Sequence, residues 1–349
     1  MERSGRVTQV EVARRAGVSQ AMVSLVLNGS DSVRVTPETR RRVEDALRET
    51  GYSVDVLGRR LRGKANRLLG VFTYESVFPS GSADFYVPFL GGIEEEAERA
   101  GYDLLLFTSP GRREGRRHVY EAGGNRLGIA DGSILLGRHT DRDELARLLH
   151  ERFPFVFIGR RESPAGEVSW VSADYAAATG DLYELAWSRG HRRIGLVGLA
   201  ESNEATVDRR AGYKRAARAH RRRAEIIDGE DPAEVWSRIQ DLDLTMVLVE
   251  TVPMAEALTT LVRADGKEVP ADLSIGVLGD RDPSQALPST RVGEELPWTM
   301  FHIPRREMGV EAVRLLVDDL ESRTAGEGRR QVLLPCELDE GATIRSLRS

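Results

Sequence analysis

Apolar residues recur at helical spacing in a short segment near the start of the chain. Val10, Ala13 and Ala16 lie three residues apart and so share one face of a helix. Gly17 follows directly, and glycine tolerates the positive φ with which many helices end. Ser19 is a good N-cap, because its hydroxyl accepts a hydrogen bond from a free N–H of the next helix. The pattern predicts one helix that ends before Gly17 and a second that begins after Ser19.

The second predicted helix buries Val23, Val26 and Leu27. The residues that point outward near its start are Gln20, Ala21, Ser24 and Leu25. Two short helices joined by a tight turn have the form of a helix-turn-helix, whose second helix enters the major groove of DNA N-terminus first. The alternative is an ordinary helical hairpin of a small core.

A third helix is predicted from Thr36 to Gly51. Thr36 is its N-cap, Pro37 takes the first helical position, and Gly51 ends it. Its apolar stripe consists of Val43, Ala46 and Leu47. Three arginines at 40–42 either contact phosphates or form a solvated face, and both interpretations stay open. The basic segment 52–66 is poor in apolar residues, as is typical of a linker that orders on binding DNA.

From Leu68 onward, short apolar runs alternate with helical segments. The runs expected as strands cover residues 68–74, 102–108, 132–137, 155–159, 193–198, 245–250 and 273–279. The expected helices between them cover 89–101, 142–151, 176–189, 208–219 and 254–264. This alternation predicts parallel sheets covered on both faces. Because the span exceeds what one such sheet needs, we expect two lobes with a ligand cleft at the carboxyl ends of their strands.

Composition indicates a water-soluble chain of more than one domain. The chain has 349 residues, of which 40% are hydrophobic, and it has no apolar run of the length that spans a membrane. A polar start in place of a signal peptide predicts a cytoplasmic, nucleoid-associated protein without membrane association. Cys336 is the only cysteine, which excludes an internal disulfide and a multi-thiolate metal site.

Charge is distributed unevenly along the chain. Residues 1–66 contain 13 basic and 8 acidic residues, a net charge of +5, although the whole chain carries −5. A basic head on an acidic body is typical of a phosphate-binding module joined to a soluble sensor. Chance clustering is the alternative.

Short motifs over residues 7–64 carry a family resemblance. They are Val-Thr at 7–8, Glu-Val-Ala at 11–13, Ala-Gly-Val-Ser at 16–19, Leu-Asn at 27–28, Val-Thr-Pro-Glu-Thr-Arg at 35–40, Gly-Tyr at 51–52 and Leu-x-Gly-Lys at 61–64. With these motifs the segment resembles the DNA-binding head of the LacI/GalR family of bacterial repressors. The resemblance implies a hinge helix whose Leu61 is wedged into the minor groove at the centre of a palindromic site.

The expected DNA contacts combine the outward face of the second helix with this hinge. They are Thr8, Ser19, Gln20, Ala21, Met22, Ser24, Leu25, Asn28 and Leu61. Gln20 and Ala21 are expected at bases, and the serines, Thr8 and Asn28 at phosphates. The family often carries arginine where this chain has Leu25. Arginine can form two hydrogen bonds with guanine, whereas leucine offers only apolar contact, for instance to a thymine methyl.

Later motifs resemble the periplasmic-binding-protein-like sensor of the same family. They include Gly-His-Arg-Arg-Ile at 190–194, Arg-Arg-Ala-Gly-Tyr at 209–213 and Val-Pro-Ala-Asp-Leu-Ser-Ile at 269–275. The resemblance implies a multidomain protein. An all-α helix-turn-helix head would occupy 1–53, a hinge helix or linker 54–66, and a two-lobed α/β effector-binding and dimerisation domain with parallel sheets 67–349.

The same resemblance implies that polar side chains at strand ends bind the hydroxyls of a sugar. The candidate effector-binding residues are Asp84, Phe85, Tyr86, Asp174, Arg209, Arg281 and Asp282. The first three are expected in the loop after the first strand. Arg209 can grip two neighbouring hydroxyls or a carboxylate with its planar fork. For each candidate, a helix cap or an ion pair at the rim is the alternative role.

Lobe two departs from the family's pattern. Glu250 and Thr251 stand where Asn-Asp is usual, and Arg281 stands where an acidic residue is frequent. An unusual sugar, a larger oligosaccharide and a negatively charged ligand therefore all stay open as effectors.

These features predict a sequence-specific DNA-binding transcriptional regulator. We expect a repressor of carbohydrate-use genes that binds a palindromic double-stranded DNA operator as a homodimer, with a tetramer as a further possibility, under control of a small effector. The first alternative is an activator, or a co-repressor-dependent regulator that senses a non-sugar or anionic ligand; a solute-binding protein is a remote one. Nucleotide-loop, nucleophile-elbow and metalloprotease motifs are missing from the sequence, so we expect neither an enzyme nor a cofactor or metal.

Overall fold

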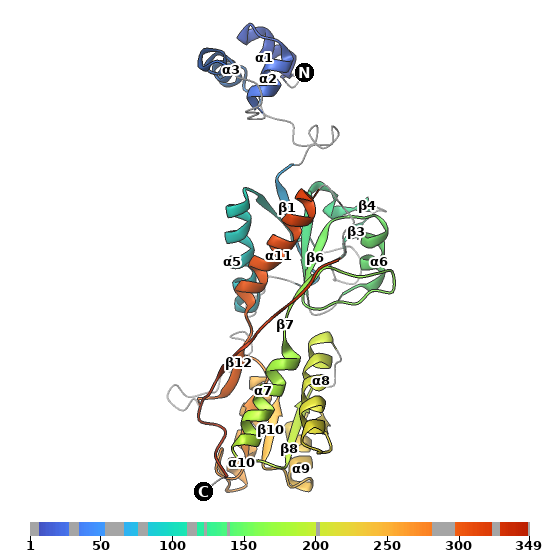
Figure 1. The fold of residues 1–349 in the computed structure, drawn as a ribbon, viewed down its shortest axis with the longest axis vertical. Helices are drawn as coiled ribbons and strands as arrows, with labels where there is room; N and C mark the ends of the chain where they lie inside the picture. Colours follow the sequence, from blue (N-terminus) through green and yellow to red (C-terminus); the bar gives the residue numbers. More distant parts are fainter. Residues whose placement is uncertain are drawn as a thin grey trace. The chain divides into compact units, whose positions relative to one another are not determined.

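The computed structural model describes residues 7–27, 35–52, 66–75, 83–109, 117–121, 124–137, 140–199, 203–280, 297–322 and 329–347. The chain divides into two compact units, residues 1–66 and 67–349. Figure 1 traces both units, each of which has its own core. The predicted hinge lies outside the described residues, as do Asn28, Leu61, Arg281, Asp282 and the side chain of Asp84.

The first unit consists of three helices, α1 (Gln9–Ala16), α2 (Gln20–Leu27) and α3 (Pro37–Thr50). Its termini follow the predicted signals. Gly17 ends α1 and Gly51 ends α3, both with φ of 62°, and the Thr36 hydroxyl accepts a hydrogen bond from the Thr39 N–H at 3.3 Å. The core contains Val12, Ala13, Ala16, Val23, Val26, Val43 and Ala46.

The expectation that Val10 faces this core is wrong. Val10 is 60% exposed, whereas Val12 is fully buried. The inward face of α1 is centred between Val12, Ala13 and Ala16, and Val10 lies roughly 110° around the helix from that centre. An eight-residue helix over a small core buries only one narrow stripe.

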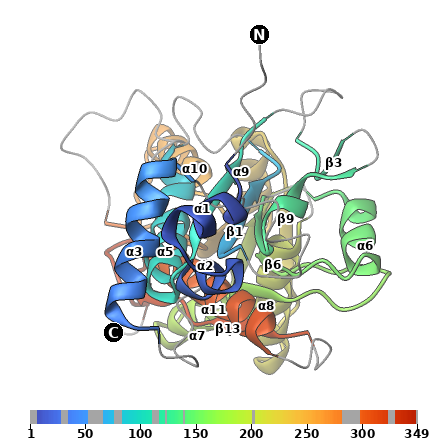
Figure 2. The same cartoon turned by 90° about the horizontal axis from the view of Figure 1, so that it is seen from above.

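Lobe one of the second unit is built on a parallel sheet in the order β13-β7-β6-β5-β1-β2. Its strands are β1 (Leu68–Thr73), β2 (Asp103–Phe107), β5 (Gly132–Leu136), β6 (Phe155–Ile158), β7 (Trp170–Ala173) and β13 (Gln331–Leu334). Helices α5 (Ala83–Ala100) and α11 (Arg305–Glu321) cover one face, and α6 (Arg142–His150) covers the other, as Figures 1 and 2 show. A small hairpin, β3 (Tyr120–Glu121) with β4 (Gly124–Asn125), and a 3-10 helix at Arg126–Ile129 precede β5.

Lobe two has a second sheet in the order β14-β12-β11-β10-β8-β9, with only β14 antiparallel to its neighbour. Its strands are β8 (Ile194–Gly198), β9 (Glu225–Asp228), β10 (Met246–Val249), β11 (Ser274–Val277), β12 (Thr299–His302) and β14 (Glu337–Asp339). Helices α7 (Tyr175–Ser188) and α8 (Glu204–Ala219) pack on one face, and α9 (Pro232–Asp241) and α10 (Val252–Ala264) on the other. The predicted α/β class with parallel sheets and two lobes is confirmed.

The chain crosses between the lobes three times. It passes from β7 to α7, from β12 to α11, and from β13 to β14. Lobe one is therefore completed by α11 and β13, which come after most of lobe two in the sequence. The carboxyl ends of the parallel strands lead into these crossings, and this places the candidate site there.

Helix α5 begins earlier than predicted. The expected start at Phe89 follows Pro88, but the helix runs from Ala83 through Pro88. Asp84, Phe85 and Tyr86 therefore lie in the first turn of a helix and not in a loop, which corrects the prediction. Pro88 is the sixth residue of α5, beyond the first turn, so it removes one hydrogen bond of the helix interior, which makes a helix start just after it the simpler expectation.

Candidate functional site

The start of α2 is an accessible polar surface. Thr8, Ser19, Gln20 and Ala21 are exposed, and the other described DNA candidates, Met22, Ser24 and Leu25, are half-buried. The Ser19 hydroxyl accepts a hydrogen bond from the Met22 N–H at 3.2 Å, as its predicted capping role requires. Its own proton stays available for a phosphate oxygen. The first turn of α2 has no acidic residue, so an approaching phosphate meets the positive end of the helix dipole.

Arg42 has a role that the sequence left open. Its Nε and Nη2 donate to the Ala16 carbonyl at 3.1 and 2.9 Å, and Nη2 also donates to the Gly17 carbonyl at 3.0 Å. These carbonyls lie at the end of α1, where intrahelical donors are missing and the dipole is negative. Arg42 therefore ties α3 to the turn between α1 and α2. The neighbouring Arg40 and Arg41 are exposed.

In the second unit, the crossings gather polar residues from both lobes. Arg209, on α8, places its guanidinium carbon 4.4 Å from the ring centroid of Tyr175, directly after the first crossing. Its Nε is buried without a hydrogen-bond partner. Within the described ranges, neither a hydrogen bond nor an ion pair is formed by Arg209. A planar cation held by stacking alone keeps its donors available for a ligand.

Asp174 lies beside Arg209 but already has a structural role. Its carboxylate accepts a hydrogen bond from the Ala177 N–H at 2.8 Å and so caps α7. Cys336, on the third crossing, is close to both residues. Burial raises the pKa of its thiol to about 12, with the charge of Arg209 lowering it and that of Asp174 raising it further. Asp174 and Arg209 thus both lie near Cys336. Asp174 has the role of a helix cap, which was the alternative to ligand binding.

A partly buried ion pair lies at the second crossing. Arg305 donates from Nη1 and Nη2 to the two carboxylate oxygens of Asp280, both at 2.7 Å. The guanidinium carbon of Arg305 also lies 4.9 Å from the ring centroid of Phe85. Phe85 therefore contacts the crossing region from the first turn of α5.

Lobe one contributes a polar network at the ends of β1 and β6. The Tyr86 hydroxyl donates to Glu75 at 2.7 Å, and Arg117 donates to the Thr73 hydroxyl at 2.7 Å and to the Glu75 carbonyl at 2.9 Å. Arg161 is only 7% exposed and lies over the Phe157 ring at 4.3 Å. Burial is the main cause that lowers the pKa of both Arg117 and Arg161.

Two further ion pairs of the described residues join the lobes, both between the end of β6 and α8. Arg160, after β6, contacts Asp208 of α8 at 2.9 Å, and Arg161 contacts Glu204 at 3.4 Å. Both acids lie in the first half of α8, so the strand ends of lobe one are tied to this helix of lobe two. A movement of the lobes would change these contacts.

Glu250, at the end of β10, is the most buried acid on the lobe-two side. It is 6% exposed. Its Oε2 accepts hydrogen bonds from the Leu199 N–H and the Thr206 hydroxyl, each at 3.2 Å, whereas Oε1 is buried without a partner. The family's usual hydrogen-bonding pair is missing here, but a strong acceptor stands in its place.

Several buried polar atoms without partners lie near the carboxyl ends of the strands, where the chain crosses between the lobes. They include Oε1 of Glu250 and the Nε atoms of Arg209, Arg210 and Arg305. Each such atom costs stability unless something else satisfies it. Several of them on facing strand ends indicate a polar ligand. Sequence analysis did not name Tyr175 or Glu250 as site residues, although Glu250 directly follows β10 and Tyr175 comes two residues after β7.

Comparisons with known proteins agree with this architecture. The family model "Bacterial regulatory proteins, lacI family" matches residues 8–55. "Periplasmic binding proteins and sugar binding domain of LacI family" matches 74–235, and "Periplasmic binding protein-like domain" matches 183–344.

Two relatives match nearly the whole chain. HTH-type transcriptional regulator CelR of Thermobifida fusca is 31% identical over 93% of this chain and 95% of its own length. HTH-type transcriptional repressor CytR of Escherichia coli is 29% identical over 97% of both chains. By these comparisons the chain is similar to regulators and not to enzymes.

Solved structures give the same result for the fold. A CelR–cellobiose complex aligns with a TM-score of 0.61 at 25% identity, covering 97% of this chain and all of that one. A lac repressor dimer bound to operator and the anti-inducer ONPF aligns with a TM-score of 0.69 at 21% identity, covering 97% and 99%. Within the described ranges, every helix is too short or too polar to span a lipid bilayer.

Proposed function

Since the chain belongs to the LacI family and is a DNA-binding transcriptional regulator, we propose that it represses carbohydrate-use genes as a homodimer under control of a sugar held between its lobes. The observation that carries the effector part is the group of buried, unpartnered polar atoms at the facing strand ends. The cellobiose bound by the relative CelR supports a carbohydrate in this position.

In this proposal two heads bind a palindrome whose half-sites lie about one helical turn apart. Gln20, Ala21 and Leu25 contact bases from the start of α2, and Thr8 and Ser19 contact phosphates. Thr8 suits this role because it is exposed and its hydroxyl does not cap α1. The hinge places Leu61 in the minor groove.

Arg209 and Glu250 are the proposed effector contacts of lobe two. The Arg209 fork can donate to two neighbouring hydroxyls, and Oε1 of Glu250 can accept from a third. Ligand binding would move the lobes and so change the separation of Arg160 and Asp208. The movement would alter the dimer interface and the hinge, and DNA would be released. A sugar acid is the second candidate ligand, favoured by the missing ion pair of Arg209.

A salt titration tests the DNA-binding part. Affinity of the full chain for a palindromic duplex should fall steeply as salt rises from 50 to 200 mM, because phosphate contacts release counterions. An affinity that does not change with salt concentration, or that is the same for a scrambled duplex, would contradict the proposal.

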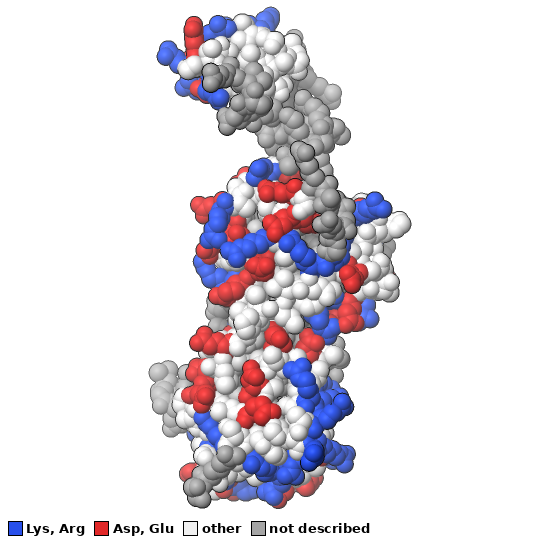
Figure 3. All heavy atoms as spheres, in the orientation of Figure 1, with Lys and Arg blue, Asp and Glu red and all other residues white. Residues whose placement is uncertain are grey.

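A thermal-shift screen tests the effector part. It should include disaccharides, oligosaccharides and sugar acids, with Arg209→Ala as the site variant and Arg218→Ala as the matched control. Arg218 is exposed on the same helix, where Figure 3 shows Lys and Arg side chains gathered on lobe two. The stabilising ligand should lose its effect in Arg209→Ala and keep it in Arg218→Ala. Equal stabilisation of both variants would remove Arg209 from the site.

A further inference from the structure

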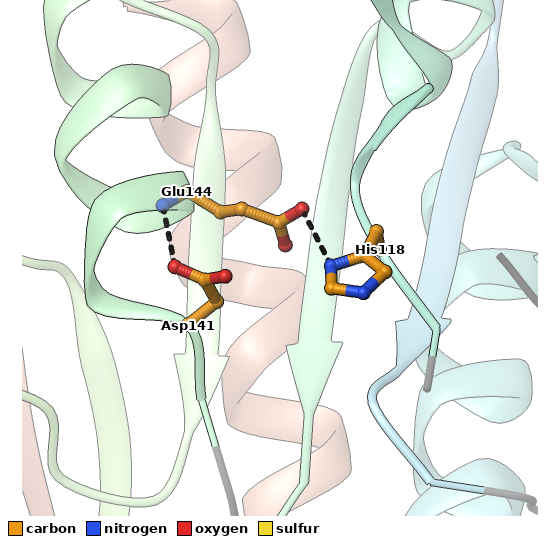
Figure 4. Close-up of side chains that lie close together, drawn as sticks. All are labelled: His118, Asp141 and Glu144. Atoms are coloured by element: carbon orange, nitrogen blue, oxygen red, sulfur yellow. Dashed lines mark hydrogen bonds and ion pairs between the residues drawn. The ribbon is translucent and has the colours of Figure 1, made fainter. Parts of the chain in front are cut away.

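Three potential metal ligands meet where β5 leads into α6. Figure 4 shows His118, Asp141 and Glu144 with their side chains directed toward one another. One ligand atom from each lies within 4.8 Å of both others. Asp141 and Glu144 belong to the start of α6, and His118 comes from the segment before β3.

The spacing suits a first-row metal ion. His118 Nδ1 lies 3.3 Å from Glu144 Oε1. Two ligands that each bind a metal at about 2.0–2.1 Å in tetrahedral geometry are about 3.3 Å apart. Asp141 is exposed, so small rotations of its side chain can bring its carboxylate closer. Its Oδ1 caps α6 through the N–H groups of Asp143 and Glu144, and Oδ2 has no partner among the described residues.

Glu144 is a buried carboxylate that has no Lys or Arg partner among the described residues. It is 8% exposed and accepts hydrogen bonds from the Val119 and Tyr120 N–H groups. Among the described residues its only ion pair is with His118, although the chain has 50 lysines and arginines. The backbone N–H groups offset part of the cost of burying this carboxylate, and no Lys or Arg of the described residues offsets the rest. A cation between the three side chains would remove that cost.

A buried hydroxyl provides a second, independent indication. Tyr74 is 9% exposed, and its hydroxyl has no hydrogen-bond partner. Burial, followed by the charges of Glu144 and Asp141, raises the pKa of this hydroxyl, so it lies near both carboxylates. As a neutral oxygen near both carboxylates, this hydroxyl could contact a metal-bound water.

We propose that His118, Asp141 and Glu144 bind one divalent transition-metal ion, with Zn²⁺ as the best match. One imidazole and two carboxylates form a donor set that Zn²⁺ accepts, and the remaining position is open to water. Because nitrogen is a poor ligand for Ca²⁺ and Mg²⁺, neither should bind there as tightly. The ion would fix the segment at 118–120 to the start of α6.

Calorimetric titration of the EDTA-treated, tag-free full chain with Zn²⁺ tests the proposal. One ion per chain is expected. Asp141→Asn is the decisive variant, because asparagine preserves the N-cap while removing the ligand charge. It should weaken binding at least tenfold, as should His118→Ala and Glu144→Gln. His150→Ala, at the other end of α6, and Cys336→Ser should bind like the original chain.

Co²⁺ supplies a second readout. Its visible absorption should show the bands of a four-coordinate nitrogen–oxygen site, and these should disappear in Asp141→Asn. Absence of saturable Zn²⁺ binding in the original chain would overturn the proposal. So would equal affinity in Asp141→Asn and the original chain, or the same loss in His150→Ala. If His118→Ala is unfolded by circular dichroism, Asp141→Asn and Glu144→Gln still decide the question.

Discussion

Replacing Arg42 by alanine should loosen the helix-turn-helix without touching DNA-contacting residues. The substitution removes three hydrogen bonds from the guanidinium to the carbonyls of Ala16 and Gly17. Hydrogen bonds to charged groups contribute roughly 1.5–3 kcal/mol each when well buried. Arg42 is exposed, so water can replace much of each bond, and we expect a total loss of about 1–2 kcal/mol.

Hydrogen exchange of the full chain measures this loss where it occurs. Amides of α1 and α2 should exchange roughly 5–30 times faster in Arg42→Ala, the factor that corresponds to 1–2 kcal/mol of opening free energy. Arg41→Ala is the matched control, since Arg41 is exposed on the same helix. Operator affinity should fall in Arg42→Ala because the reading helix is less often in place. If the two variants exchange at the same rate, Arg42 does not secure the turn.

Three further predictions concern packing, pH and base preference. Gly212→Ala places a methyl group 2.1 Å from the Ala176 carbonyl oxygen, so it should lower the free energy of unfolding in urea by about 1–3 kcal/mol. Gly128→Ala is the control, because Gly128 has open space around it. Equal urea midpoints of the two variants would contradict the close approach of α7 and α8. His191 is fully buried, with Nδ1 3.0 Å from the Thr245 hydroxyl and Nε2 3.1 Å from the Arg345 carbonyl, and burial lowers its pKa. Because the pKa of His191 is lower in the folded than in the unfolded protein, the unfolded protein binds a proton first as pH falls. The contribution of the neutral His191 to the free energy of unfolding is therefore complete above about pH 6.5 and is lost as pH falls toward the folded-state pKa. His191→Gln should therefore flatten the loss of urea stability between pH 7.5 and 5.5, and an unchanged slope would exclude His191 as its source. Leu25→Arg should create a preference for guanine at one position of each half-site, worth about 1–3 kcal/mol on paired duplexes; equal affinity for both duplexes would show that residue 25 does not contact bases.

Local signals predicted the head well. Gly17, Ser19, Thr36 and Gly51 act through their own backbone or the next turn, so their roles follow from sequence neighbours. Arg42 could not be assigned in this way. Its partners lie 25 and 26 residues away, and only the packing of α3 against α1 brings them within reach.

In the second unit, continuous apolar runs predicted β1, β2, β5, β6, β8, β10 and β11 but not β7, β9, β12, β13 and β14. β9, β13 and β14 are only partly buried, and polar residues occur in β7 and β12, so all five give a weak apolar signal. Arg209 and Asp174 are site candidates from the family's motifs and stay predictions; Asp174 follows β7, and Arg209 lies in the second turn of α8. Tyr175 was missed because the stacking that defines its role comes from α8, which is remote in the sequence.

The three crossings have a consequence for how the protein is made. Strand β13 pairs with β7, about 160 residues earlier, and α11 packs against α5, with contacts between residues 211 and 218 positions apart. During synthesis the head is complete after residue 52, but lobe one cannot close its sheet until residue 334 has left the ribosome. A chain that stops short of β13 would therefore carry a finished DNA-binding head on an unfinished sensor. Control by an effector therefore requires the strands that are synthesised last, whereas the DNA-binding head does not.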